Sequence, residues 1–437
     1  MDGGIVALIL FGSLLLFMGL GIPVAFTLGG LSLIFGFFFW DGLSSVDGFV
    51  LGSFGKVSEF TLSALPLYIL MAAILRYSDL AEDMYEAIYR WLGGIKGGLA
   101  AGTNVVSSIF GSMTGIATVA TATLGVTARP SMLKRGYDSK LISGTIVAGG
   151  SLGVLLPPSI IMILYASEAG VSTAALFFAG IGPGILATLV FMAYVLIVCY
   201  IKPEMGPSID KANRFTFGEK LTSLKGILLP VSIIILVLGT IYTGVATPTE
   251  AASVGVMGAV VSAGIKKKMN WSNIKQMFMM TVRINGMVFW LLIGATAYAR
   301  IVTVSGVGDW FAGTITGLDV NRWLILVGIL LIFFILGMFI DPAGILLMTA
   351  PLFLPVITGL DFDPIWFGVL FIITMCMGYM TPPFGFNLFV LRGVAPDISI
   401  RELYVSVWPF VGLYILVIIL VMVFPNIALW LPDNFMN

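Results

Sequence analysis

A proline pair interrupts the apolar stretch GSLGVLLPPSIIMILYA, which covers residues 150–166. A second proline pair interrupts a similar stretch, MGYMTPPFGFNLFVL, at residues 377–391. Proline has no backbone N–H and clashes with the preceding helical turn, so a helix breaks where two prolines follow each other. The break frees backbone carbonyls before the pair and N–H groups after it. Both stretches are therefore predicted to be broken helices with unpaired backbone dipoles near their middle.

The composition places these broken helices in a membrane. Of the 437 residues, 59% are apolar and only 10% are charged, whereas soluble globular chains carry about 25% charge. The 22 cationic and 22 acidic side chains cancel, which removes the positive field that a nucleic acid partner requires. The chain has no histidine, which argues against histidine-based catalysis and a histidine proton relay. Cys199 and Cys376 lie in apolar runs and are predicted to be buried.

Apolar runs of about 17 to 25 residues predict the membrane spans. The predicted spans lie near 5–20, 23–40, 60–76, 140–166, 170–201, 226–243, 248–265, 286–303, 364–391 and 402–424. Two more apolar stretches, 98–128 and 322–360, are interrupted near the middle by GSMTG and GMFIDPAG. We interpret both as re-entrant helical hairpins, because lipid cannot satisfy the backbone groups that such residues free. Segments 79–91 and 271–282 have the amphipathic pattern of interfacial helices.

The distribution of Lys and Arg predicts the orientation. Cationic residues gather at 129–140, 202–225 and 266–268, whereas the connection at 41–59 has one and that at 305–320 has none. Cytoplasmic loops carry the excess of cationic residues. The three basic segments are therefore predicted to face the cytoplasm, and both termini the outside.

An internal match predicts a duplication. At an offset of 225 residues Pro23 matches Pro248, Gly153 matches Gly378, and the two proline pairs match each other. Each half holds five spans and one hairpin, and because five is odd the second half must be inverted. Inverted repeats with broken helices are typical of secondary transporters. The predicted fold class is an all-α integral membrane protein with two inverted repeats.

We divide the chain accordingly. The predicted parts are a first scaffold part at 1–92, a first transport part at 93–201 with hairpin 98–128 and broken helix 140–166, a cytoplasmic linker at 202–225, a second scaffold part at 226–320, and a second transport part at 321–437 with hairpin 322–360 and broken helix 364–391.

The broken helices and hairpin tips carry the candidate chemistry. Freed carbonyls and hydroxyls suit a hard monovalent cation, and the N-terminus of a half-helix suits a carboxylate. Asp341 lies at the second tip, and an ionisable residue inside the membrane indicates function. The sequence favours coupling to sodium over coupling to protons, because it has no histidine and few acidic residues inside the membrane that could relay a proton. Two interpretations of Asn387 stay open: its side chain either binds substrate or bridges two helices. The alternative to a binding site at each proline pair is a simple kink of the helix. Glu250 is predicted to be an N-cap partner of Thr247 or Thr249.

Four motifs carry a family resemblance. They are GSMTGIATVATATLG at 111–125, GVLLPPSIIMILYA at 153–166 followed by GVSTAALFFAGIGPG, YTGVATPTEAASVGV at 242–256, and GYMTPPFGFNLFVLRGVA at 378–395. They resemble the large membrane subunit of tripartite ATP-independent periplasmic (TRAP) transporters over essentially the whole chain. The resemblance implies an elevator-type, sodium-driven importer in the bacterial inner membrane, with a small four-helix membrane subunit and a soluble periplasmic binding protein as partners.

The resemblance also implies ligand positions. Sodium is expected at Ser112, Met113, Thr114, Gly115, Gly153, Pro157, Gly337, Phe339, Asp341, Thr381 and Pro382. Substrate contacts are expected at Ser112, Thr114, Pro158, Ser159, Pro383 and Asn387. Met113 and Thr114 depart from the serine-rich first tip that is commoner in the family. The substrates of the family are organic acids, notably C4-dicarboxylates and sialic acids. The alternative function is a self-sufficient sodium/dicarboxylate symporter, and we do not expect an enzyme.

Overall fold

The chain is helical throughout the part that the structure describes. The computed structural model describes residues 3–40, 42–209 and 215–436, and no strand occurs in these ranges. Lys211 and Arg214, which contribute to the predicted basic linker, lie outside the described residues. The first half contains α1 (Gly3–Gly19), α2 (Val24–Phe39), α3 (Leu43–Val57), η1 (Phe60–Ser63), α4 (Ala64–Arg76), α5 (Leu80–Leu92), α6 (Gly98–Thr114), α7 (Ala117–Leu133), α8 (Ser139–Leu152), α9 (Ile160–Ala169) and α10 (Thr173–Ile201).

The rest of the chain comprises the linker and the second half. The linker contains η2 (Pro203–Met205) and α11 (Phe217–Ser223). The second half contains α12 (Lys225–Tyr242), α13 (Pro248–Ile265), α14 (Trp271–Val304), α15 (Val307–Thr316), α16 (Arg322–Gly337), α17 (Pro342–Gly359), α18 (Pro364–Gly378), α19 (Phe386–Val394), α20 (Ile400–Val423) and α21 (Asn426–Phe435). Within the described ranges, six helical segments are long and apolar enough to cross a membrane, or seven if the bent pair of α3 and α4 counts as one span. The prediction of a multi-pass membrane protein is confirmed in this respect.

Both predicted hairpins form. In the first hairpin, the Thr103 hydroxyl near the start of α6 lies 3.9 Å from the sulfur of Met132 near the end of α7. In the second, the ring of Trp323 at the start of α16 lies 5.2 Å from that of Phe362, just after α17. The first and last residues of each hairpin therefore lie together. The tip of each hairpin lies at the opposite end of its two helices.

Both predicted broken helices form as well. The first consists of α8 and α9, and the second of α18 and α19, with cis peptide bonds at Pro157–Pro158 and Pro382–Pro383. An aspartate caps the first half of each: Asp138 accepts from the Leu141 N–H at 2.9 Å and Asp363 from the Trp366 N–H at 2.8 Å. A side-chain acceptor at the N-cap satisfies a backbone donor that the first helical turn leaves free.

Three predicted segments need correction. The stretches 41–59 and 305–320 are not plain connections, because α3 and α15 lie in them. Segment 271–282 does not end before the next span, since α14 runs unbroken over 34 residues. No proline interrupts α14, so no residue in it lacks the backbone N–H that a continuous helix needs. At 1.5 Å per residue α14 is about 51 Å long, well beyond a bilayer core of about 30 Å.

Two other sequence predictions are confirmed. Thr247 and Glu250 form a capping box at the start of α13, in which each side chain bonds the backbone of the other. Cys199 and Cys376 are both buried and free.

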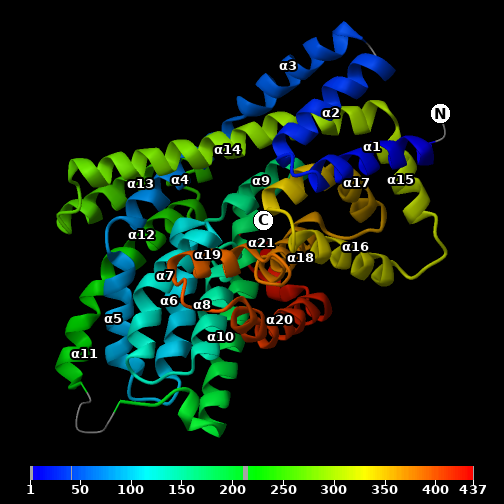
Figure 1. The fold of residues 1–437 in the computed structure, drawn as a ribbon. Helices are drawn as coiled ribbons and strands as arrows, with labels where there is room; N and C mark the ends of the chain where they lie inside the picture. The colour runs from blue at the N-terminus through cyan, green and yellow to red at the C-terminus, as the bar shows by residue number, and fades with distance from the viewer. Residues whose placement is uncertain (1–2, 41, 210–214, 437) are drawn as a thin grey trace.

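The hairpins and broken helices pack into one body. Figure 1 shows α6, α7 and α8 side by side left of the centre, between α5 and α10, and α8 contacts both helices of this hairpin. The second half reaches the same body through α20, which packs on α8, and α18, which packs on α10. The long helix α14 lies along α2, α3 and α4 at the upper edge of Figure 1.

Candidate functional site: two hairpin tips and two broken helices

The first hairpin tip is a tight turn between α6 and α7. Gly115 ends α6 with a φ of 61°, a left-handed conformation that glycine adopts without steric cost. Its N–H donates to the Gly111 carbonyl at 2.7 Å. A Cβ added at Gly115 would lie 3.0 Å from the Pro158 carbonyl oxygen, so the tip rests on the proline pair of the first broken helix.

Two glycines bring the tip and the broken helix into backbone contact. A Cβ on Gly111 would lie 2.3 Å from the Cα of Gly153, and one on Gly153 would lie 2.6 Å from the Cα of Gly111. No side chain fits between these two backbones. The structure thus brings together Gly115, Gly153 and Pro158, three of the residues predicted for the first site.

The polar atoms at this first site are oxygens. The Ser112 hydroxyl donates to the Ile109 carbonyl at 3.0 Å, and the Thr114 hydroxyl donates to the Phe110 carbonyl at 3.1 Å. Their lone pairs stay available to a cation. Ser159 stands at the N-cap of α9, and its hydroxyl is buried without a partner. Met113 is buried beside them, so it can contribute its backbone but offers only a weak thioether ligand. Ser112 and Pro157 line one cavity of about 390 Å³.

The second hairpin tip repeats this arrangement. A Cβ on Gly378 would lie 2.9 Å from the Cα of Gly337, so the end of α16 meets the end of α18 backbone to backbone. Behind this contact, the Gly385 N–H donates to the Met338 carbonyl at 3.2 Å. Phe339 turns its ring outward, where it is 49% exposed and lies 5.7 Å from the ring of Phe384. Only the backbone of Phe339 is therefore suited to a site at this tip.

Asp341 is the carboxylate of the second tip. Its Oδ1 accepts from the Ala343 N–H at 2.9 Å, which makes it the N-cap of α17. Its Oδ2 accepts from the phenol of Tyr379 at 2.7 Å. Each carboxylate oxygen has more than one lone pair, so these two donors orient the group and leave capacity for a cation.

Thr381, Pro383 and Asn387 follow along the second broken helix. The Thr381 hydroxyl is buried and donates to the Met377 carbonyl at 2.7 Å. The Pro383 carbonyl accepts from the phenol of Tyr404. The Asn387 side chain is fully buried, and both its amide atoms lack a partner. Leaving a buried polar group unpaired costs about 1–3 kcal/mol. Asn387 bridges no helix in this structure, which favours the substrate-binding interpretation of the two that the sequence leaves open.

The two sites lie next to each other. The Ser151 hydroxyl, at the end of α8, lies 3.9 Å from the sulfur of Met380 and 2.7 Å from the phenol oxygen of Tyr414. Ser151 comes two residues before Gly153 of the first site, and Met380 directly precedes Thr381 of the second. The two broken helices therefore cross at their breaks.

The first hairpin also meets the second broken helix. A Cβ on Gly125 of α7 would lie 2.8 Å from a methyl carbon of Leu391 of α19. Beyond the end of α19, Asp397 pairs with Arg129 of α7 at 2.5 Å. The first hairpin and the second broken helix are therefore joined by both an apolar contact and an ion pair.

A sequence model of one family covers nearly the whole chain. The model is that of the tripartite ATP-independent periplasmic transporter, DctM component, and it matches residues 11–427. The chain belongs to this DctM family. It is therefore the large membrane component of a TRAP transporter, and the resemblance noted in the sequence is confirmed.

Curated relatives of this DctM-family chain are permease subunits. It is 29% identical over 393 residues to the C4-dicarboxylate TRAP transporter large permease protein DctM of Pseudomonas aeruginosa, which covers 89% of this chain and 90% of that protein. It is also 29% identical over 417 residues to the ectoine TRAP transporter large permease protein TeaC of Halomonas elongata, which covers 95% and 96%. These relatives are transporters and not enzymes.

A solved structure shares the fold. The YdaH transporter of Alcanivorax borkumensis superposes with a TM-score of 0.65 over 95% of this chain and 99% of that one, at 15% identity. At this identity the likeness concerns the fold alone.

The sequence did not predict the role of several residues that contribute to the site. Met338, Tyr379 and Tyr404 were not assigned to it, and Gly111 was placed at the first tip but not among the ligand positions. Tyr379 had a local signal, since it is a lone phenol beside the proline pair in an apolar stretch. Gly111 opens the GSMTG motif, but its contact with Gly153 spans two helices and leaves no mark in the local pattern.

Proposed function

We propose that this DctM-family chain is a sodium-coupled permease that imports an organic anion by an elevator movement of its hairpins and broken helices. The observation that carries the proposal is the paired arrangement of Gly111 on Gly153 and Gly337 on Gly378. Each pair holds a hairpin tip against the break of a helix, where freed backbone groups accumulate. Two such sites that cross at Ser151 and Met380 form one compact binding region.

The donor chemistry supports sodium. Carbonyls, hydroxyls and one carboxylate are hard oxygen ligands. Within the described residues, no three Cys, Asp or Glu side chains come together as a metal-binding group. Sodium at the first tip would use Ser112, Thr114 and nearby carbonyls, and sodium at the second would use Asp341 and Thr381. Each bound ion would draw a hairpin tip onto its broken helix.

The substrate would bind between the two breaks. The half-helices α9 and α19 begin two and three residues after the proline pairs, so their free N–H groups suit a carboxylate. The unpaired Ser159 hydroxyl and Asn387 amide are buried at these same starts. A ligand that hydrogen-bonds them would offset the cost of burying them unpaired. A substrate with carboxylate and hydroxyl groups therefore fits.

The element bounds support an inverted duplication. The starts of α7 and α17, and those of α8 and α18, differ by the 225-residue offset of the proline pairs. In the same register, the bent pair of α3 and α4 corresponds to the continuous helix α14. A fixed scaffold at 1–92 and 226–320, with moving parts at 93–201 and 321–437, is consistent with this symmetry.

The orientation follows from the basic segments. Asp83 in the first turn of α5 pairs with Lys266, and Trp91 in its last turn donates to the Lys220 carbonyl at 2.9 Å. The amphipathic α5 thus extends between two segments that are predicted to face the cytoplasm. This supports a position along the cytoplasmic interface, with both termini in the periplasm.

Family membership supports the partners and the substrate class. We infer that a small four-helix membrane subunit and a periplasmic binding protein act with this chain. The names of the relatives include a C4-dicarboxylate permease and an ectoine permease. We propose an organic acid of the C4-dicarboxylate or sialic acid class as the cargo.

Reconstitution tests the proposal. The chain would be purified with a TRAP-type small membrane protein and a periplasmic binding protein of the same organism, and placed in liposomes. Uptake of labelled succinate and N-acetylneuraminate would be measured with an inward sodium gradient and with choline in its place. We expect uptake of one of them that requires both sodium and the binding protein. Sodium-driven uptake by this chain alone would favour the self-sufficient symporter, and uptake that is indifferent to sodium would refute the coupling.

A further inference from the structure

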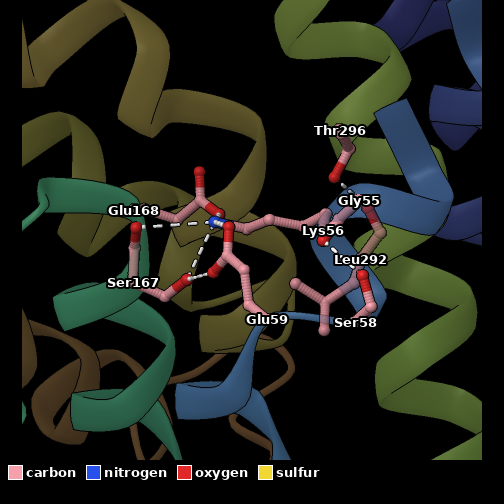
Figure 2. A network of polar contacts seen from close by, with 8 residues as sticks. All are labelled: Gly55, Lys56, Ser58, Glu59, Ser167, Glu168, Leu292 and Thr296. Carbon is pink, nitrogen blue, oxygen red and sulfur yellow. Dashed lines mark hydrogen bonds and ion pairs between the residues drawn. The ribbon is translucent and has the colours of Figure 1, made fainter. Parts of the chain in front are cut away.

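A cluster of charged side chains joins two parts of the chain outside the candidate site. Lys56 lies at the end of α3 and Glu59 just before η1, within the proposed scaffold. Ser167 and Glu168 lie in the last turn of α9, within the proposed transport part. Figure 2 shows the Lys56 side chain reaching across from α3 to the end of α9.

The Lys56 ammonium is surrounded by oxygens. It lies 3.0 Å from Glu168 Oε1, 3.2 Å from Glu59 Oε1 and 2.8 Å from the Ser167 hydroxyl, with the Ser167 carbonyl at 3.4 Å. The Ser167 hydroxyl in turn donates to Glu59 Oε2 at 2.7 Å. Every member therefore contacts at least one residue of the opposite part.

The cluster is partly buried. The side chains of Lys56 and Glu168 are only 14% and 17% exposed, while that of Glu59 is 42% exposed. Removal of Lys56 would leave two carboxylates facing each other with little water around one of them, which is unfavourable. The ammonium is thus the positive charge that compensates Glu59 of one part and Glu168 of the other.

The surroundings of the cluster leave room for separation. A cavity of about 400 Å³ lies beside it, between residues 59–61 at the start of η1, residues 166–167 and 170–174, and residues 247–249. Close apolar packing does not fill this space. Water can enter from the cavity and hydrate the charges when the two parts move apart, so the contact can open without stranding an ion in lipid.

We propose that Lys56, Glu59, Ser167 and Glu168 form an ionic latch that holds the first scaffold part against the first transport part at one end of the transport cycle. The latch rests on the proposed elevator function, because only relative movement of the two parts gives it something to hold. It opens once in each cycle and sets the population of the state seen in this structure.

Distance measurements between spin labels test the latch. Labels at Leu51→Cys on α3 and Leu189→Cys on α10 sit on exposed positions, and the two native cysteines are buried. The wild-type background would be compared with Lys56→Met. Loss of an ion pair of this exposure is expected to raise the population of separated conformers by about fivefold. Lys56→Glu combined with Glu168→Lys is expected to restore the original distribution.

A matched control uses an ion pair within one helix. Arg90 and Glu86 pair at 2.9 Å within α5, so Arg90→Met should leave the distances unchanged. The latch is overturned if Lys56→Met gives the wild-type distribution, or if Arg90→Met shifts it as strongly.

Cross-linking separates the latch from the proposed function. Lys56→Cys combined with Glu168→Cys would be linked in the reconstituted complex by a bifunctional methanethiosulfonate reagent, because the two side chains meet only at their ends and a direct disulfide requires Cα atoms within about 7 Å. Each single variant is a control. We expect sodium-dependent uptake to stop on cross-linking and to return when reduction cleaves the disulfides of the linker. Full uptake by the cross-linked protein would overturn the latch and leave the proposed function standing. If the unmodified complex takes up neither succinate nor N-acetylneuraminate, the proposed function fails, and the distance measurements still decide the latch.

Discussion

The phenol of Tyr379 donates a hydrogen bond of 2.7 Å to Oδ2 of Asp341. Asp341 is the N-cap of α17 at the second hairpin tip, and Tyr379 directly follows the end of α18. The bond therefore ties the tip to the broken helix beside the contact of Gly337 with Gly378. Together with the N–H of Ala343 on Oδ1, it fixes the orientation of the carboxylate.

Replacement of Asp341 should weaken the response to sodium. Asp341→Asn keeps the shape but removes the charge, so the sodium concentration for half-maximal uptake should rise about tenfold, the equivalent of about 1.4 kcal/mol. Tyr379→Phe removes one hydrogen bond, typically worth about 1 kcal/mol. It should raise the sodium concentration for half-maximal uptake by a smaller factor. Uptake kinetics at varied sodium would measure both. Tyr68→Phe is the control, because its phenol donates to the Pro248 carbonyl away from the tips. Unchanged sodium dependence in Asp341→Asn would remove this residue from the site.

A methyl group at Gly111 should push the first tip away from its broken helix. The added Cβ would lie 2.3 Å from the Gly153 backbone, and overpacking of this kind costs about 1–3 kcal/mol. We expect a lower midpoint of thermal unfolding and lost uptake. Gly328→Ala in α16 meets no atom within 4 Å, and it should keep or slightly raise the midpoint because alanine favours the helix. Equal midpoints in the two variants would contradict the close backbone contact.

Substitution of Asn387 should separate stability from transport. Its amide is buried without a partner, so Asn387→Leu removes an unpaired polar group and should leave the protein as stable or more stable. Uptake should nevertheless fall, because the substrate loses a partner. Thermal unfolding and uptake would be measured on the same preparation, with Asn434→Leu at the exposed end of α21 as control. Normal uptake by Asn387→Leu would show that the amide does not face the substrate.

Two hydroxyls in similar local settings should behave differently. Thr381 and Ser305 each donate to a carbonyl of their own helix, at 2.7 and 2.9 Å. Thr381 lies at the second break, whereas Ser305 ends α14 in the proposed scaffold. Thr381→Val should reduce sodium-dependent uptake several-fold, and Ser305→Ala should not. If both variants transport equally well, the proline pair at 382–383 acts only as a kink.

The ion pair between Arg129 and Asp397 should make stability depend on pH. The hydrogen bond from Arg129 holds the pKa of Asp397 below its usual value. A lowered pKa in the folded state adds stability above the usual carboxyl pKa of about 3.9, and this stability is lost as the pH falls through the folded value. The midpoint of thermal unfolding would be measured between pH 7 and pH 3. At neutral pH the midpoint of the wild type should lie above that of Asp397→Asn, and the difference between the two midpoints should shrink as the pH falls. A difference that is constant over this range would contradict the assignment.

Features of this protein that depend only on neighbouring residues along the chain could be predicted from the sequence. A proline pair breaks a helix wherever it occurs, so both breaks were predicted to within a few residues. Asp138 and Asp363 cap helices through their own neighbours, and the glycine-containing tips lie where the apolar stretches are interrupted. Membrane class, hairpins and family followed from the same short-range signals.

Contacts between distant segments were settled only by the tertiary structure. The pairing of Gly111 with Gly153, the bond from Tyr379 to Asp341 and the reach of Lys56 to Glu168 each join separate elements. Continuity of α14 also escaped prediction, because the change from an amphipathic to an apolar pattern resembled a boundary although no residue breaks the helix. Helix breaks depend on the neighbours of one residue along the chain, whereas packing depends on which surfaces meet in space, and the periodicity of the sequence does not specify that partner.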